Sequence, residues 1–172
     1  MAEFNQNEYY CANYTNFILL GIINIRTALP NEAAELTQLA LRSKAMWGYN
    51  DAFMIKCMKT LQVVPEEIEE NEAMVLTRAD NAIGFYLMTS LTTINAELDY
   101  LYVEPDFTRL GFGAMLFEHA RDTAKLLGYS SLFLQSDPNA VGFFNRMGAK
   151  IIGRQSSWNL PGYESVLMEL IF

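Results

Sequence analysis

Hydrophobic and polar residues follow two different periods along the chain, which predicts alternating strands and helices. Residues 23–26 alternate between apolar and polar and predict a first strand. Apolar positions at helical spacing then predict a helix that Asn31 caps. A second helix is predicted from Asp51, its cap, to Leu61, and Pro65 is expected to end that region.

The middle and the end of the chain continue this pattern. Turn residues at 79–81 separate two β-prone arms, 73–78 and 82–91, and predict a hairpin. A long amphipathic helix is expected after Gly111, with Gly128 as its terminator. Its apolar face consists of Phe112, Leu116, Ala120, Ala124 and Leu127. The other expected elements are strands at 96–103, 131–135, 150–153 and 164–172 and a short helix at 139–147.

The resulting order, β-α-α-β-β-β-α-β-α-β-β, predicts one mixed α/β domain over residues 1–172. Neither an internal repeat nor a linker interrupts it. Residues 1–19 are interpreted as an N-terminal extension of that domain. The glutamates between positions 66 and 72 form an acidic cluster, which predicts a solvated linker or a short helix.

The composition indicates a folded, acidic protein. Its 172 residues are 51% hydrophobic and 19% charged, which excludes an intrinsically disordered chain. Lys and Arg number 12 against 20 Asp and Glu, so the net charge is −8. Nucleic-acid binding depends on neutralising phosphates with basic residues, and this chain has no basic stripe. We therefore expect no nucleic-acid partner.

The cysteine and histidine content and the hydropathy pattern bear on metal binding, membrane insertion and secretion. Cys11, Cys57 and the single His119 fall short of a four-ligand zinc site, so no metal is expected. The longest apolar run, residues 17–23, is much shorter than the ~20 residues that span a bilayer. No Lys or Arg precedes Arg26, so the basic start of a signal peptide is missing. These patterns favour a cytoplasmic protein with no membrane partner.

The segment with the most chemical information runs from Leu98 to Leu116 and reads LDYLYVEPDFTRLGFGAML. It predicts a strand, a loop with two glycines and a helix start, where free N–H groups and the helix dipole favour a phosphate. A P-loop is excluded because Ala114 and Met115, not Lys and Ser or Thr, follow Gly113. A Rossmann fingerprint is excluded because Leu116 stands where a small residue is needed.

Four passages occur in a characteristic order: residues 25–33, the strand 98–103 with Pro105, the loop Thr108-Arg-Leu-Gly111-Phe-Gly113, and the segment 136–149. Together they resemble the GNAT superfamily of acyl-CoA-dependent N-acetyltransferases, over roughly residues 22–172. The loop lies where that family has its Gln/Arg-x-x-Gly-x-Gly/Ala pyrophosphate loop. The resemblance implies an α/β fold with a mixed, mostly antiparallel central sheet flanked by helices, and with a splayed central strand.

The resemblance also implies a site for acetyl-CoA. In the family, the backbone of the central strand pairs with the pantetheine amides, and the N–H groups of the loop hold the pyrophosphate. Thr108 replaces the family's usual Gln or Arg, and Arg109 is expected to supply the cation instead. The implied cofactor-binding residues are Leu101, Tyr102, Val103, Thr108, Arg109, Leu110, Gly111, Phe112, Gly113, Ala114, Asn139 and Phe144.

Acetyl transfer to an amine needs a base, because the amine reaches the site mostly protonated. Glu97 and Asp99 stand two residues apart on the predicted central strand and point to the same face. Either is a candidate base, and the alternative is an exposed strand carboxylate. A backbone N–H near Val103 is expected to meet the oxyanion of the tetrahedral intermediate. Phe144 stands where the family often has a tyrosine acid, and phenylalanine has no proton to donate.

The expected function is direct transfer of an acetyl group to a primary amine of a small molecule or a protein. Trp47 and Tyr49 lie between the first two helices and are candidates for the acceptor pocket, with core packing equally open. Phe144 and Thr108 motivate an alternative, an acyl-CoA-binding sensor or partner-binding module with weak or lost catalysis. The expected assembly is a monomer or a homodimer.

Overall fold

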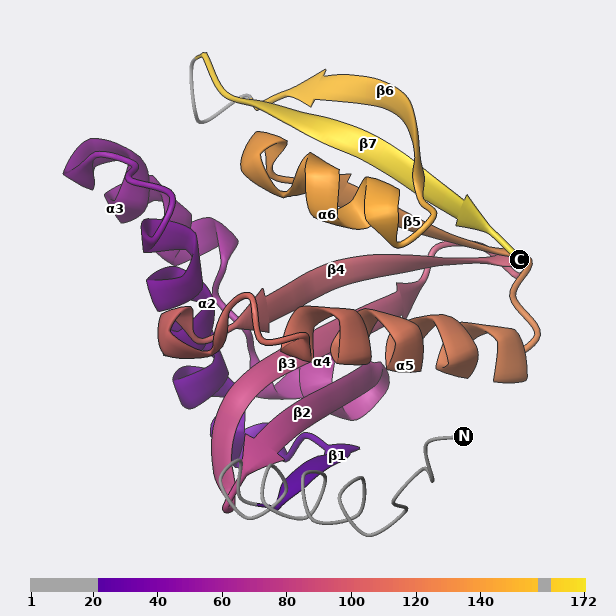
Figure 1. The fold of residues 1–172 in the computed structure, drawn as a ribbon, viewed down its shortest axis with the longest axis horizontal. Helices are drawn as coiled ribbons and strands as arrows, with labels where there is room; N and C mark the ends of the chain where they lie inside the picture. The colour runs from indigo at the N-terminus through magenta and orange to yellow at the C-terminus, as the bar shows by residue number, and fades with distance from the viewer. Residues whose placement is uncertain (1–21, 158–161) are drawn as a thin grey trace, which may run out of the picture.

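A computed structural model describes residues 22–157 and 162–172, which build one seven-stranded sheet with helices on both faces (Figure 1). The strand order is β1-β2-β3-β4-β5-β7-β6, and every neighbouring pair is antiparallel except β4 and β5. This confirms the predicted mixed, mostly antiparallel sheet. The predicted N-terminal extension, residues 1–19, lies outside the described residues. The strands are β1 Ile23–Thr27, β2 Glu72–Arg78, β3 Asn81–Ser90, β4 Asn95–Val103, β5 Ser131–Ser136, β6 Lys150–Ser156 and β7 Glu164–Ile171.

Two hydrophobic cores lie on opposite faces of the sheet. One contains the buried faces of α5 and α6, and the other contains those of α2 and α4. In the two described ranges, no helix is long and apolar enough to cross a membrane. The helices are η1 Pro30–Glu32, α2 Ala33–Ala45, α3 Asp51–Thr60, α4 Pro65–Glu70, η2 Pro105–Phe107, α5 Phe112–Leu126, η3 Pro138–Ala140 and α6 Val141–Arg146.

Three helix starts differ from the sequence prediction. Asn31 does not cap α2 but lies inside η1, where the Glu32 carboxylate accepts the Leu29 N–H at 2.7 Å. The cap of α3 is Asn50 instead of Asp51, because the Asn50 side chain accepts the N–H three residues on. Pro65 begins α4 and does not end the region, since proline at a first helical position loses no hydrogen bond.

The acidic cluster therefore forms a short helix, which was one of the two predicted outcomes. On α5, four of the five predicted apolar residues are buried, but Leu127 lies just past the helix end and is 51% exposed. Phe117, which the sequence pattern did not include, is the fifth buried residue of α5. Gly128 has a φ of +87°, as expected for a residue that terminates a helix in the left-handed conformation.

The feature that creates the site is a split between β4 and β5. These parallel strands pair only from Asn95 to Leu98, against Ser131 to Leu134, and both strands continue beyond that point. The splayed central strand predicted from the sequence is thus confirmed. On the other edge of β4, the register to β3 shifts so that Leu98 and Tyr100 face consecutive partners. Asp99 is the extra residue of this bulge, a device that re-aims a side chain locally.

Candidate functional site

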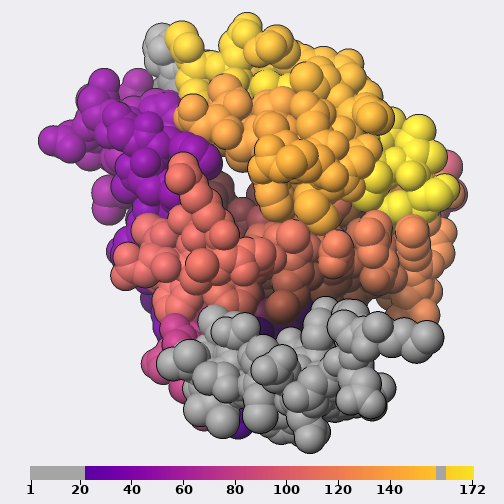
Figure 2. Space-filling model, in the orientation of Figure 1, coloured from indigo at the N-terminus to yellow at the C-terminus, as the bar shows by residue number. Residues whose placement is uncertain are grey.

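A cavity of about 960 Å³ lies where β4 and β5 separate. Figure 2 shows the surface hollowed between the purple segment that includes α3, the orange segment that includes α6, and the loop before α5. Tyr49, Glu97, Leu110 and Phe112 are not among the lining residues. The cavity does bring together most of the residues singled out from the sequence: Trp47, Asp99, Leu101, Tyr102, Val103, Thr108, Arg109, Gly111, Gly113, Ala114, Asn139 and Phe144.

One end of the cavity is formed by the start of α5. Arg109 and Gly111 both have left-handed backbones, with φ of +61° and +91°. The Met115 N–H donates to the Gly111 carbonyl at 3.0 Å, and the N–H groups ahead of Met115 have no earlier turn to donate to. Arg109 and Arg146 also line the cavity. Unpaired N–H groups, a helix dipole and two cations can together hold a phosphate group.

Leu110 and Phe112, two residues of the glycine loop, do not line the cavity. The Leu110 side chain is exposed, and the Phe112 side chain is buried in the core. A side chain at Gly113 would make an ordinary 3.6 Å contact with the Phe143 ring, and the Gly113 φ is not in the left-handed region. Backbone strain is therefore an argument for glycine at position 111, but not at position 113.

Of the two carboxylates predicted as base candidates, Asp99 lines the main cavity and Glu97 does not. Asp99 lines both the main cavity and a smaller adjoining one of about 220 Å³, which Glu97 also lines. Asp99 is exposed to solvent, but partial desolvation by the groups around it raises its pKa to about 6. A hydrogen bond from Thr89 lowers this pKa, and the nearby Glu97 charge raises it. A carboxylate with this pKa is ionised at neutral pH and still basic enough to take up a proton.

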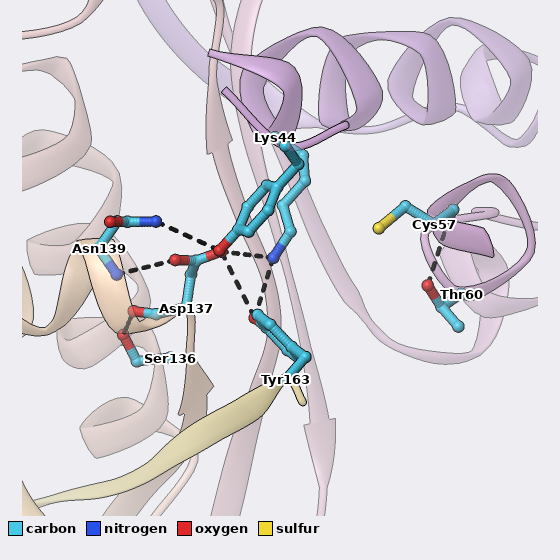
Figure 3. A network of polar contacts seen from close by, with 8 residues as sticks. Lys44, Cys57, Thr60, Ser136, Asp137, Asn139 and Tyr163 are labelled. Carbon is cyan, nitrogen blue, oxygen red and sulfur yellow. Dashed lines mark hydrogen bonds and ion pairs between the residues drawn. The ribbon is translucent and has the colours of Figure 1, made fainter. Parts of the chain in front are cut away.

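A polar network that the sequence did not predict is centred on Asp137 (Figure 3). It includes four residues that line the cavity: Lys44, Asp137, Asn139 and Tyr163. The Lys44 ammonium donates to Asp137 Oδ2 at 2.5 Å and to the Tyr163 hydroxyl at 3.0 Å. The Tyr49 hydroxyl donates to the same Asp137 oxygen at 2.8 Å. The Asn139 backbone N–H donates to Asp137 Oδ1 at 2.8 Å, and its side-chain amide donates to Tyr49 at 3.2 Å. Tyr49 is therefore a member of this network.

The electrostatics of the network favour an ionised Asp137. Burial by itself raises the pKa of Asp137, but hydrogen bonds from Lys44 and from the Asn139 N–H outweigh burial and hold that pKa below its usual range. Burial and the Asp137 charge both raise the pKa of Tyr49 and of Tyr163, so both phenols stay protonated. The sequence does contain one signal for Lys44, because it continues the buried stripe of α2 that includes Leu36 and Ala40.

Phe144, the residue that stands where a tyrosine acid was considered, is packed among other aromatic rings. Phe144 is buried and meets Phe117 and Phe143 edge to face, at centroid distances of 5.7 and 4.9 Å. Two tyrosines, Tyr102 and Tyr163, also line the cavity. In the part of the chain that the structure describes, no group of three or more His, Cys, Asp or Glu side chains is placed to hold a metal ion.

Comparison with known proteins places these features in context. The family described as "Acetyltransferase (GNAT) family" matches residues 34–149. Peptidyl-lysine N-acetyltransferase YjaB of Salmonella typhimurium is 33% identical over 99 residues, which is 58% of this chain and 63% of that protein. Its Escherichia coli namesake is 30% identical over 135 residues, covering 77% of this chain and 86% of that protein.

The fold is shared with solved structures of low sequence identity. The PaiA N-acetyltransferase of Thermoplasma acidophilum, solved in complex with coenzyme A, superimposes with a TM-score of 0.69. Its sequence is 21% identical, and the match covers 88% of this chain and 99% of that one. At this level of identity, the match shows that the two chains share a fold.

Proposed function

Because the chain belongs to the GNAT acetyltransferase family, we propose that it transfers an acetyl group from acetyl-CoA to a primary amine, with a protein lysine as the favoured acceptor. One observation carries the proposal: a single cavity at the split of β4 and β5 joins a phosphate-binding helix start to a carboxylate of raised pKa. The names of the two bacterial relatives support lysine as the acceptor class.

The residues at the helix start fit the phosphates of CoA. The N–H groups from Arg109 to Ala114 would hold the pyrophosphate, with Arg109 and Arg146 as nearby cations. The edge of β4 left unpaired beyond Leu98 offers the backbone groups of residues 101–103 to the pantetheine amides. A related fold solved with coenzyme A supports this choice of ligand. When bound, acetyl-CoA supplies an activated thioester.

We assign the role of general base to Asp99. It lines the cavity together with Thr60 and Leu61 from the end of α3, it is the extra residue of the bulge, and its raised pKa suits proton uptake. Glu97 is a positioning residue in this proposal, because it lies in the adjoining cavity and acts on Asp99 through its charge. Trp47, which lines the cavity at the end of α2, is proposed to contact the acceptor.

Acetyl-CoA is expected to stabilise the fold. A ligand that binds only the native state adds about 2.7 kcal/mol at a free concentration a hundred times its Kd. For a domain of this size, that is a rise of several degrees in Tm. The measurement is a thermal melt with and without millimolar acetyl-CoA, with adenosine as the control. An unchanged Tm would contradict the proposed site.

Phe144 is the one observation that favours the second candidate function, CoA binding without efficient turnover. If the enzyme is active, F144Y should raise kcat modestly, because the departing thiol, with a pKa of about 8.5, already leaves near neutral pH without a strong acid. The matched control is F143Y, which places a hydroxyl on the neighbouring ring that lines the same cavity. Turnover is followed as release of CoA thiol with lysine peptides.

Three outcomes of this comparison separate the two functions. A rise confined to F144Y supports a transferase that lacks its proton donor. No turnover in either variant or in the wild type, with acetyl-CoA still bound, favours the binding module. A large loss in F144Y contradicts both accounts and assigns Phe144 to the wall of an apolar pocket.

A further inference from the structure

The network around Asp137 lies beyond the point where backbone pairing between β4 and β5 ends. Pairing between β4 and β5 stops at Leu98 and Leu134, three residues before Asp137. Lys44 comes from α2, which packs against β3 and β4 on one side of the split. Asp137 and Tyr163 come from the ends of β5 and β7 on the other side. The contact between Lys44 and Asp137 therefore bridges the two halves of the split sheet (Figure 3).

The bridge is almost completely shielded from solvent. The side chains of Lys44 and Asp137 are 9% and 10% exposed. Three aromatic rings surround the ammonium, with centroids 4.8 Å away for Tyr163, 5.2 Å for Tyr49 and 5.6 Å for Phe53. Each partner of this ion pair makes further hydrogen bonds from other directions, and these bonds fix the positions of the two side chains relative to each other.

Both Asp137 oxygens are already engaged. Oδ2 accepts from Lys44 and Tyr49, and Oδ1 accepts from the Asn139 N–H. The carboxylate has therefore little capacity left to act as a base or to bind a substrate amine. What it can do is fix η3, which it caps, to the end of α2. That connection joins residues that line the cavity on both sides of the split.

We propose that Lys44 and Asp137 are positioning residues that hold the two walls of the cavity at the separation at which acyl donor and amine acceptor meet. The proposal rests on the proposed function. The donor lies along β4 in that function, and the acceptor contacts Trp47 at the end of α2. Misplacing reacting groups by about 1 Å can lower a rate by about 100-fold, so a fixed separation has a direct effect on kcat.

The first test replaces the ammonium by an apolar side chain in Lys44→Met. We expect kcat with a lysine peptide to fall by about 10- to 100-fold. The Kd for CoA, measured by calorimetry without turnover, should change much less than kcat, because the loop before α5 that is proposed to hold the pyrophosphate is not part of the bridge. Amide hydrogen exchange in η3 should become faster, which reports the loss of the connection independently of activity.

Two further variants separate positioning from stability. Lys44→Met leaves the Asp137 charge buried and unpaired, which destabilises the fold. The double variant Lys44→Met/Asp137→Leu removes both charges, and such apolar replacements are often neutral for stability. We expect it to regain the wild-type Tm while kcat stays low. The matched control is Arg42→Met, because Arg42 lies two residues earlier on α2 and pairs with Glu104 within one half of the sheet.

The outcomes distinguish a failure of the proposed function from a failure of the bridge alone. A wild-type protein that fails to bind CoA would overturn the proposed function and the role of the bridge with it. Wild-type kcat in Lys44→Met, with CoA bound normally, would overturn the bridge alone. Recovery of kcat together with Tm in the double variant would also overturn it, because stability would then explain the whole effect. Loss of kcat in both bridge variants, with Arg42→Met unaffected, supports it.

Discussion

Replacing Asp99 by asparagine is expected to lower kcat/KM for the amine acceptor by about 10²- to 10⁴-fold, the usual contribution of a positioned general base. Asparagine keeps the size of the side chain and removes its ability to take up a proton. The Kd for acetyl-CoA should stay unchanged, since the phosphate end of the cavity is built from α5 and the loop before it. Steady-state kinetics and calorimetry on the same preparation check both expectations.

The pH dependence of the reaction gives a second measurement of the same assignment. With a pKa of about 6 for Asp99, kcat/KM should rise as pH increases through 6, because only the ionised carboxylate accepts a proton. The Glu97 charge raises that pKa, so E97Q should move the rising limb to lower pH. An E97Q variant that loses as much activity as D99N would contradict the assignment and make Glu97 the base.

Stability should respond to Asp99 in the opposite sense from activity. The folded state raises the pKa of this carboxyl above its ordinary value of 3.8, so it binds the proton more tightly than the unfolded chain. The contribution of Asp99 to folding is thus most favourable below about pH 4 and is lost as pH rises through 6. At neutral pH, D99N should melt no lower than the wild type, and a clear fall in its Tm would show a structural role.

Substituting valine for Gly111 is expected to abolish CoA binding at concentrations that saturate the wild type. Gly111 has a φ of +91°, a conformation that a β-branched residue avoids at a cost of about 1–3 kcal/mol. The loop must therefore change its backbone, and the N–H groups before Met115 then point elsewhere. Each lost hydrogen bond to a charged phosphate removes about 1.5–3 kcal/mol, or roughly 10- to 100-fold in Kd.

Gly128→Val is the matched control for this substitution. Gly128 lies just beyond the other end of α5, with a φ of +87° and, like Gly111, open space where a side chain would begin. Both variants should lose similar stability, and only G111V should lose CoA. The check is calorimetry with CoA at a temperature where both variants are folded. Equal losses of CoA affinity would mean that general destabilisation is responsible, and would remove the phosphate role from the loop.

The order of elements was predictable because each one depends on local periodicity and local turn chemistry. The hairpin between β2 and β3, the helix after Gly111 and its end near Gly128 all follow from residues that are neighbours in sequence. The predictions were wrong for Pro65 and for Leu127 and, at two helix starts, for the caps Asn31 and Asp51. The caps show the reason most clearly. There the outcome depends on which side chain reaches a free N–H, and adjacent candidates are nearly equivalent on a sequence pattern.

Only part of the candidate site can be predicted from the sequence. The glycine loop and the carboxylates of β4 each consist of residues close together in the sequence, so a local pattern is enough to predict them as candidates. The preference for Asp99 over Glu97 comes from a bulge in the register between β3 and β4 and from the cavity, which Asp99 lines and Glu97 does not. Neither can be read from alternation, because an extra residue in a strand changes which face the following side chains occupy.

The sequence by itself determined an acidic α/β chain with a glycine loop before a helix and two carboxylates on one strand, since these features come from composition and from residues close together in the chain. Only the tertiary structure decided that β4 and β5 separate after Leu98 and that Lys44 closes the gap by reaching Asp137, 93 positions away. The stability of a buried ion pair depends on the surroundings that the whole fold supplies. No local pattern specifies which lysine will find which carboxylate.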